Sequence, residues 1–163
     1  MPRSSVRAGP APSRYSLRMQ LTRYTDFGLR VMMYLTQGNG RDAPVTIPEI
    51  AERFDVSRHH MVKVVHFLAQ QGWVATTRGK GGGLRLAHPP AAYRVGDLVH
   101  ALEHQGALIN CGEPPCALNG VCRLSGVLAD SLQVFYDALN RHTLADLVRA
   151  PTGEAIVRLH LAA

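Results

Sequence analysis

Two short helix signals joined by a tight turn, between residues 47 and 70, constrain the fold more than any other feature of the chain. The first is the segment TIPE at residues 46–49, a capping box with proline in the first helical turn. Residues 55–56 provide the turn, and Ser57 is placed to cap a second helix. The inward positions of that helix are apolar: Met61, Val64, Val65 and Leu68. The pair predicts a helix-turn-helix over residues 47–70.

A glycine-rich hairpin is predicted directly after this pair, over residues 73–87. Residues 73–77 (WVATT) and 84–86 (LRL) have β-strand character, and the intervening RGKGGG forms a basic turn. A nucleotide P-loop is unsupported, because the strand–loop–helix context and a following serine or threonine are missing. Glycine instead removes side-chain bulk, so that Arg78 and Lys80 can approach a DNA groove closely. The predicted fold is mainly α-helical, with a winged helix-turn-helix and a small β-wing.

Positive charge is concentrated in the same region. The chain has 163 residues and a formal net charge of +6, yet no acidic residue occurs between Asp55 and Asp97. The interval carries six fixed positive charges: Arg58, Lys63, Arg78, Lys80, Arg85 and Arg94. A merely solvated face would mix both signs, whereas a long acid-free stretch is typical of a surface that binds a polyanion. Double-stranded DNA is therefore the expected partner.

The expected DNA contacts divide among three parts of this surface. The start of the second helix is predicted to face base edges in the major groove: Ser57, Arg58, His59 and His60. We expect Lys63 and Arg85 to contact phosphates, while Arg78 and Lys80 on the hairpin reach the minor groove. Histidines on a recognition helix are more often DNA contacts or packing residues than metal ligands, so no metal is assigned to them.

All three cysteines fall within twelve residues, at Cys111, Cys116 and Cys122. The surrounding loop is rich in glycine and proline, and three thiols on one loop provide soft ligands for zinc or an iron–sulfur cluster. A purely structural role is disfavoured, because buried structural cysteines would normally be scattered along the chain. A disulfide is disfavoured as well, because it would leave the third thiol unpaired and the chain has no export signal. Zinc is the serious rival, but the spacing is looser than its usual knuckles, so a redox cofactor is favoured. A fourth ligand is needed.

Three further helices and a basic extension complete the predicted organisation. Residues 21–34, 95–103 and 122–139 have apolar residues at helical spacing. The apolar stripe of residues 122–139 is wide enough to cover a core and still contact a partner helix. This favours a helix that forms a homodimer over one that only packs against its own core. Residues 1–18 carry four arginines and no acid, so we expect a disordered extension, unless translation starts at Met19. The sequence has no apolar run of about 18 residues, so we expect a cytoplasmic protein that does not cross a membrane. It also has no nucleophile–base constellation, so we do not expect an enzyme.

Several motifs in one order resemble the winged-helix iron–sulfur repressors of the NsrR/IscR group, from Met19 to about Val148. The matching segments are MQLTRYTDFGLR, VSRHHMVKVV, TRGKGGGLRLA, CGEPPCALNGVCRL and HTLADLV. The resemblance implies a homodimeric repressor with a DNA-binding domain over residues 19–94, a linking helix and cluster loop over 95–125, and a dimerisation helix with its tail over 126–163. The implied cofactor is an iron–sulfur cluster, with 4Fe-4S favoured and 2Fe-2S as the alternative.

The fourth cluster ligand separates the branches of that group. The branch that regulates iron–sulfur status uses a histidine three positions after the third cysteine, where this chain has Ser125. In the nitric-oxide-sensing branch, an aspartate near the start of the first helix reaches across the dimer, and Asp26 matches it. Asp26 also has a structural interpretation, as an acidic residue in the first turn of the helix, where the helix dipole favours negative charge. Glu113 and His104 are the other candidates for the fourth ligand. The implied function is repression relieved by nitric oxide, with iron–sulfur-status regulation or a zinc-stapled DNA-binding protein as alternatives.

Overall fold

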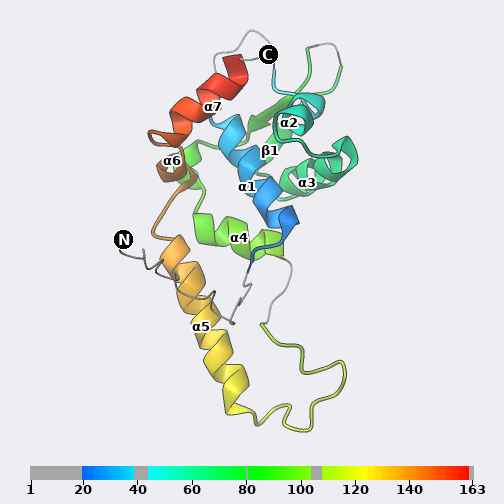
Figure 1. Cartoon of the computed structure of the whole chain (residues 1–163), viewed down its shortest axis with the longest axis vertical. Helices are drawn as coiled ribbons and strands as arrows, with labels where there is room; N and C mark the ends of the chain where they lie inside the picture. The colour runs from blue at the N-terminus through cyan, green and yellow to red at the C-terminus, as the bar shows by residue number, and fades with distance from the viewer. Residues whose placement is uncertain (1–19, 39–43, 80, 104–107, 162–163) are drawn as a thin grey trace, which may run out of the picture.

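The computed structural model describes residues 20–38, 44–79, 81–103 and 108–161 (Figure 1). The elements are α1 (Arg23–Leu35), α2 (Ile47–Arg53), α3 (Arg58–Gln70), β1 (Val74–Thr76), β2 (Leu84–Leu86), the 3-10 turn η1 (Pro90–Ala92), α4 (Val95–Glu103), α5 (Arg123–Leu139), α6 (Leu144–Leu147) and α7 (Thr152–Leu161). The fold is mainly helical with a small two-stranded antiparallel sheet, which confirms the predicted class. The predicted extension at 1–18, Lys80 and His104 lie outside the described residues.

Side-chain caps start the first three helices, and two of these caps lie at positions that the sequence predicts. Thr22 caps α1, so that Asp26 falls in its first turn. Thr46 and Glu49 form the predicted capping box at the start of α2. Ser57 caps α3 by accepting a hydrogen bond from the His60 amide at 3.3 Å. The helix-turn-helix is therefore set by local hydrogen bonds that short side chains provide.

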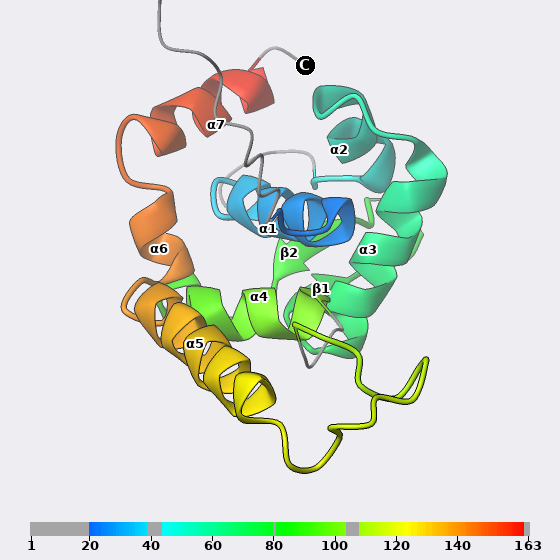
Figure 2. The ribbon, with the colours of Figure 1, turned by 60° about the horizontal axis from the view of Figure 1, so that its bottom comes forward.

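Helix α1 occupies the centre of the globular part and is surrounded by the other helices (Figure 2). Its buried residues join those of α2, α3 and α4 in one hydrophobic core. The fully buried large side chains include Met32, Tyr34, Leu35, Ile50, Met61, Leu68, Leu98, Leu102 and Leu144. Gly28 permits this packing, because a Cβ added there would lie 2.7 Å from a methyl of Leu102. Helices α1 and α4 can therefore lie close together at the end of α4.

Helix α5 projects from this globular part as an arm (Figure 1). A second small cluster, formed by Val95, Val99 and Tyr136, holds its C-terminal half against α4. Of its seventeen residues, Tyr136 is the one that is buried. The rest of α5 therefore gains little from packing within a single chain.

The last part of the chain folds back onto the globular part, which the sequence pattern did not indicate. Thr143 caps α6, and its amide and hydroxyl donate to Asp146, so that the pKa of this carboxyl lies below its ordinary value. Helix α7 then buries Ile156 in the main core. His160 stacks on the ring of Tyr34, with 3.9 Å between ring centroids, and its Nε2 lies 3.0 Å from the Tyr34 carbonyl oxygen.

Candidate functional site

The outer face of α3 carries the residues predicted to read DNA. Ser57, Arg58, His59, His60 and Lys63 are all exposed. The opposite face is anchored in the core by four buried side chains: Met61, Val64, Val65 and Leu68. The helix can therefore enter a groove while its packing stays intact.

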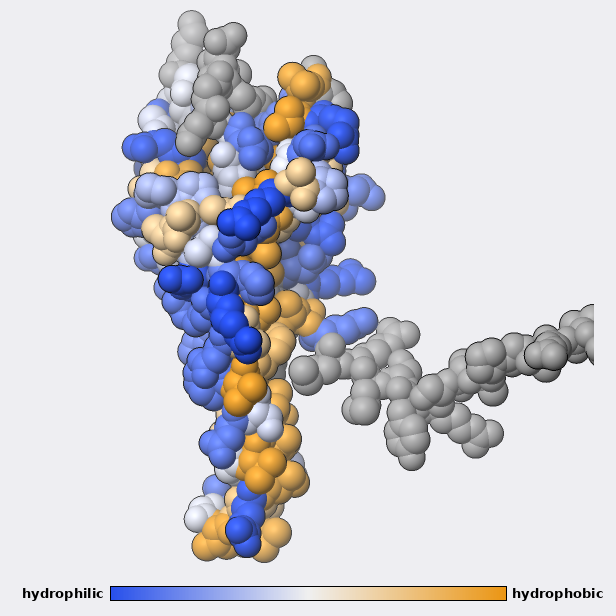
Figure 3. Space-filling model, turned by 90° about the vertical axis from the view of Figure 1, so that its left-hand side faces the viewer, coloured by the Kyte–Doolittle hydropathy of each residue, from blue (hydrophilic) through white to orange (hydrophobic). Residues whose placement is uncertain are grey.

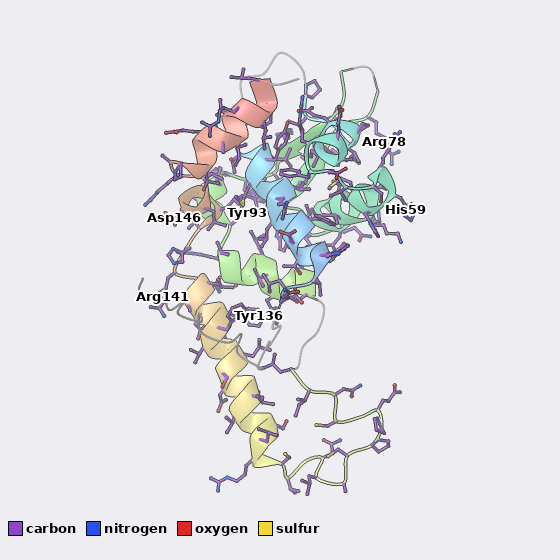
Figure 4. The ribbon with its side chains drawn as sticks, viewed as in Figure 1. His59, Arg78, Tyr93, Tyr136, Arg141 and Asp146 are labelled. Atoms are coloured by element: carbon purple, nitrogen blue, oxygen red, sulfur yellow. The ribbon has the colours of Figure 1, made fainter. Side chains whose placement is uncertain are left out.

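The wing adds basic side chains to the same side of the molecule. Figure 4 shows His59 of α3 and Arg78 of the wing pointing toward the same side. Arg85 is exposed on β2, opposite Ala75 of β1. Gly82 is required in the tip, because an added Cβ would lie 2.3 Å from the Thr77 carbonyl oxygen. The two exposed arginines therefore stand on a short hairpin with a tightly folded tip.

The structure adds residues of α1 to this surface that sequence reasoning missed. A cavity of about 360 Å³ lies between the first turns of α1 and α3. Its lining residues are Arg23, Tyr24, Phe27, Asp55, Val56, Ser57, His60, Lys63 and Val64. Arg23 is exposed beside the predicted phosphate contact Lys63. Because 40 positions of chain separate these residues, helical periodicity could not bring them together.

The three cysteines lie on the long loop between α4 and α5, outside the hydrophobic core (Figure 1). Cys111 and Cys122 are partly buried, Cys116 is exposed, and all three are free thiols. The Cys116 amide donates to the Cys111 carbonyl at 3.1 Å, and Asn110 Oδ1 accepts from the Gly112 amide at 2.9 Å. Within the described residues, no three His, Cys, Asp or Glu side chains are placed to hold a metal ion. The donor types fit a cluster, while their convergence on one point stays a prediction.

The candidate fourth ligands occupy different parts of the chain. Asp26 forms an ion pair with Arg30 one turn later, with 2.8 Å between Nε and the carboxylate oxygen, and both side chains are roughly half exposed. Glu113 is exposed on the loop, and Ser125 lies in the first turn of α5. His104 lies outside the described residues. Ligation by Asp26 across a dimer therefore stays a prediction.

Helix α5 carries apolar surface that the single chain leaves exposed. Leu124 and Val127 are each 60% exposed, and Val134 is 65% exposed. Figure 3 shows apolar side chains along the projecting arm. Next to the arm, residues of α1, α4 and α5 line an apolar cavity of about 460 Å³. An exposed stripe beside a hollow of this kind is typical of a protein–protein contact.

Comparison with known families gives one match over most of the chain. Residues 21–150 match the family Rrf2, described as an iron-dependent transcriptional regulator. The match includes the helix-turn-helix, the wing, the cysteine loop and α5, and it ends before α7. In the part of the chain that the structure describes, no helix is both long and apolar enough to cross a bilayer.

Solved structures have the same arrangement of elements. CymR (YrzC), the global cysteine regulator of B. subtilis, is 24% identical with a TM-score of 0.63, over 79% of this chain and 95% of that chain. IscR of T. potens is also 24% identical with a TM-score of 0.63, over 80% and 87% of the two chains. A protein of Listeria innocua assigned as a transcriptional regulator is 25% identical with a TM-score of 0.64, over 82% and 88%. These likenesses confirm the predicted winged-helix fold.

Proposed function

The chain belongs to the Rrf2 family of transcriptional regulators, and on that basis we propose that it is a DNA-binding repressor that senses nitric oxide through an iron–sulfur cluster. The observation that carries this proposal is a loop with three free cysteines outside the hydrophobic core. The sensing of nitric oxide is favoured because Ser125 stands where the iron–sulfur-status branch has a histidine. That branch is the second candidate, since the family is described as iron-dependent.

The exposed faces of α3 and the wing support the DNA-binding part of the proposal. Arg58 and His59 extend from the capped first turn of a helix whose other face is buried, which suits insertion into the major groove. Arg78 at the wing tip suits a narrow minor groove, where the negative potential is strongest. Phosphate contacts from Lys63 and Arg85 would fix the position of the domain on the duplex.

The exposed stripe of α5 supports a homodimer. Two copies that pair through this helix would bury the apolar surface that a single chain leaves in water. A symmetric pair would also present two α3 helices to two half-sites of an operator. Pairing along α5 thus serves both stability and sequence recognition.

In the proposed dimer, Cys111, Cys116 and Cys122 hold the cluster together with the partner's Asp26. When bound, the cluster supplies iron that reacts with nitric oxide. Asp26 is the weakest of these ligands, because a carboxylate binds iron less tightly than a thiolate. It also belongs to α1, which packs against α3, so a constraint on Asp26 constrains the DNA-binding surface. A switch from 99% to 1% occupancy needs about 5.5 kcal/mol of differential affinity.

Operator binding is expected to need the cluster, with nitric oxide rather than the iron supply as the signal that relieves it. The measurement is a gel shift with anaerobically purified protein and increasing nitric oxide, while the visible spectrum is followed. An apo-protein that binds its operator as tightly as the holo-protein would contradict the proposal. A colourless anaerobic sample that binds DNA would instead indicate zinc.

Two arginines are expected to contribute to DNA binding in different ways. Arg85→Ala should weaken binding to all sequences about equally and lower the salt slope by about one unit, because it contacts a phosphate. Arg58→Ala should relax discrimination between operator and random DNA, at a cost of about 1–3 kcal/mol at the contacted base. Titrations of operator and random duplexes at several salt concentrations measure both effects.

Arg141→Ala is the matched control for the lost charge. Arg141 is exposed and lies on the opposite side of the molecule from His59 and Arg78 (Figure 4). Its replacement should leave the salt slope nearly unchanged. An unchanged operator-to-random ratio in Arg58→Ala would show that Arg58 does not read bases. The same result in His59→Ala and His60→Ala would mean that the start of α3 is not the recognition surface.

A further inference from the structure

Glu103 joins the end of α4 to the beginning of α1. Its Oε1 accepts a hydrogen bond from the Thr22 amide at 2.8 Å and a second from the Thr22 hydroxyl at 3.2 Å. Thr22 is also the N-cap of α1, whose hydroxyl accepts from the Thr25 amide at 3.2 Å. Hydrogen bonds to an ionised acceptor are the stronger class, so this contact fixes the start of α1.

The contact lies where the chain enters the cysteine loop. Glu103 is the last residue of α4, and Cys111 follows eight positions later. One residue earlier, Leu102 packs directly against Gly28 of α1. Figure 1 shows the end of α4 next to the beginning of α1. We therefore expect a rearrangement of the loop to act on this junction.

The other side of the same α1 turn meets the DNA-binding surface. Tyr24 packs edge-on against Phe67 of α3, with 5.9 Å between ring centroids, and its hydroxyl donates to the Lys63 carbonyl at 3.4 Å. Arg23 and Lys63 line the cavity between the two helices. A shift of the first turn of α1 would therefore move both a basic side chain and a contact of the recognition helix.

The surroundings of Glu103 make its hydrogen bonds with Thr22 important for its position. Its side chain faces the 460 Å³ cavity, where most of the lining residues are apolar. Burial raises the pKa of the neighbouring Tyr136 hydroxyl above its ordinary value, and the negative charge of Glu103 raises it further. If the Glu103 carboxylate lost the hydrogen bonds from Thr22, it would have to move from the apolar lining of this cavity into solvent, because an unpaired charge beside apolar surface is unfavourable.

We propose that Glu103 is a positioning residue that couples the cysteine loop to the DNA-binding surface by holding the first turn of α1 through Thr22. When the loop rearranges, Glu103 releases Thr22, and the first turn of α1 with Arg23 and Tyr24 leaves its DNA-binding position. The inference rests on the proposed function in one respect, namely that the state of the loop controls DNA affinity. It adds a route within one subunit to the link that Asp26 makes between subunits.

The test compares Glu103→Ala and Glu103→Gln with wild-type protein, each with and without its cluster. The probe is a duplex enriched from a random-sequence library by anaerobically purified wild-type protein. Glu103→Ala should lower the ratio of holo to apo affinity by about tenfold, which is within the usual range of coupling between sites. Glu103→Gln should keep most of the ratio, because its amide oxygen can still accept both hydrogen bonds. Glu154→Ala is the control for charge, since Glu154 is exposed on α7.

A second measurement follows the Thr22 contact directly. In the cluster-bound proteins, hydrogen exchange of the amides at residues 22–26 should be about tenfold faster in Glu103→Ala than in the wild type, and unchanged in Glu154→Ala. A wild-type ratio of holo to apo affinity in Glu103→Ala, or unchanged exchange at residues 22–26, would overturn the inference. A wild-type protein with equal holo and apo affinities would overturn the proposed function itself, and the two failures are thereby distinguished.

Discussion

Replacement of any one of Cys111, Cys116 and Cys122 by alanine is expected to abolish the visible absorbance of the anaerobically purified protein while leaving a folded dimer. If the three thiolates hold a cluster as proposed, none of them can be spared, and the cofactor should be lost in each variant. The fold should survive because the cysteine loop lies outside both hydrophobic clusters. The measurements are the absorption spectrum, thermal unfolding and the sedimentation of each variant.

Ser125→Ala is the matched control, since Ser125 follows the third cysteine closely and is not expected to bind the cluster. Its spectrum should equal that of the wild type. Loss of cooperative unfolding in all three cysteine variants would contradict the prediction and would indicate a structural metal.

The second large effect is expected at Tyr34, which is fully buried between α2 and α7. Tyr34→Ala should lower the free energy of unfolding by about 3–5 kcal/mol, because it leaves a cavity in the core. It also removes the stacking partner of His160 and the edge-on partner of Phe54. Urea unfolding of the apo-protein measures the change.

Tyr34→Phe separates the ring from the hydroxyl. It keeps the stacking and removes the hydrogen bond that the hydroxyl donates to Glu49 at 2.7 Å. The expected cost is about 1.5–3 kcal/mol, since the acceptor is a carboxylate. If Tyr34→Ala were no more destabilising than Tyr34→Phe, packing of the ring between α2 and α7 would contribute nothing.

The DNA-binding half of the chain could be predicted because its determinants are local. The capping box at residues 46–49, the Ser57 cap and the glycine-rich turn each act within a few positions. The alternation of buried and exposed positions on α3 follows directly from its helical period. The predicted helix over residues 95–103 likewise agrees with α4.

The contacts that join distant parts of the chain could not be predicted in this way. Tyr34 and His160 are 126 positions apart, and Thr22 and Glu103 are 81 apart. Pairings of this kind depend on how the helices pack, and no local period encodes them. The ligand role of Asp26 depends in addition on a second copy of the chain, so it remains a prediction from resemblance.

The projecting α5 has a consequence for how the protein behaves in dilute solution. A homodimer that buries this stripe is held by mass action, so its melting temperature rises with protein concentration. Dilution would separate the subunits and with them the partner's Asp26 from the cysteine loop. In the proposed dimer, the number of copies in a cell then sets how much of the protein can respond, because a lone subunit would lack the partner's Asp26 and the second half-site contact. Scarcity of the repressor and exposure to nitric oxide would thus have the same outcome at the operator.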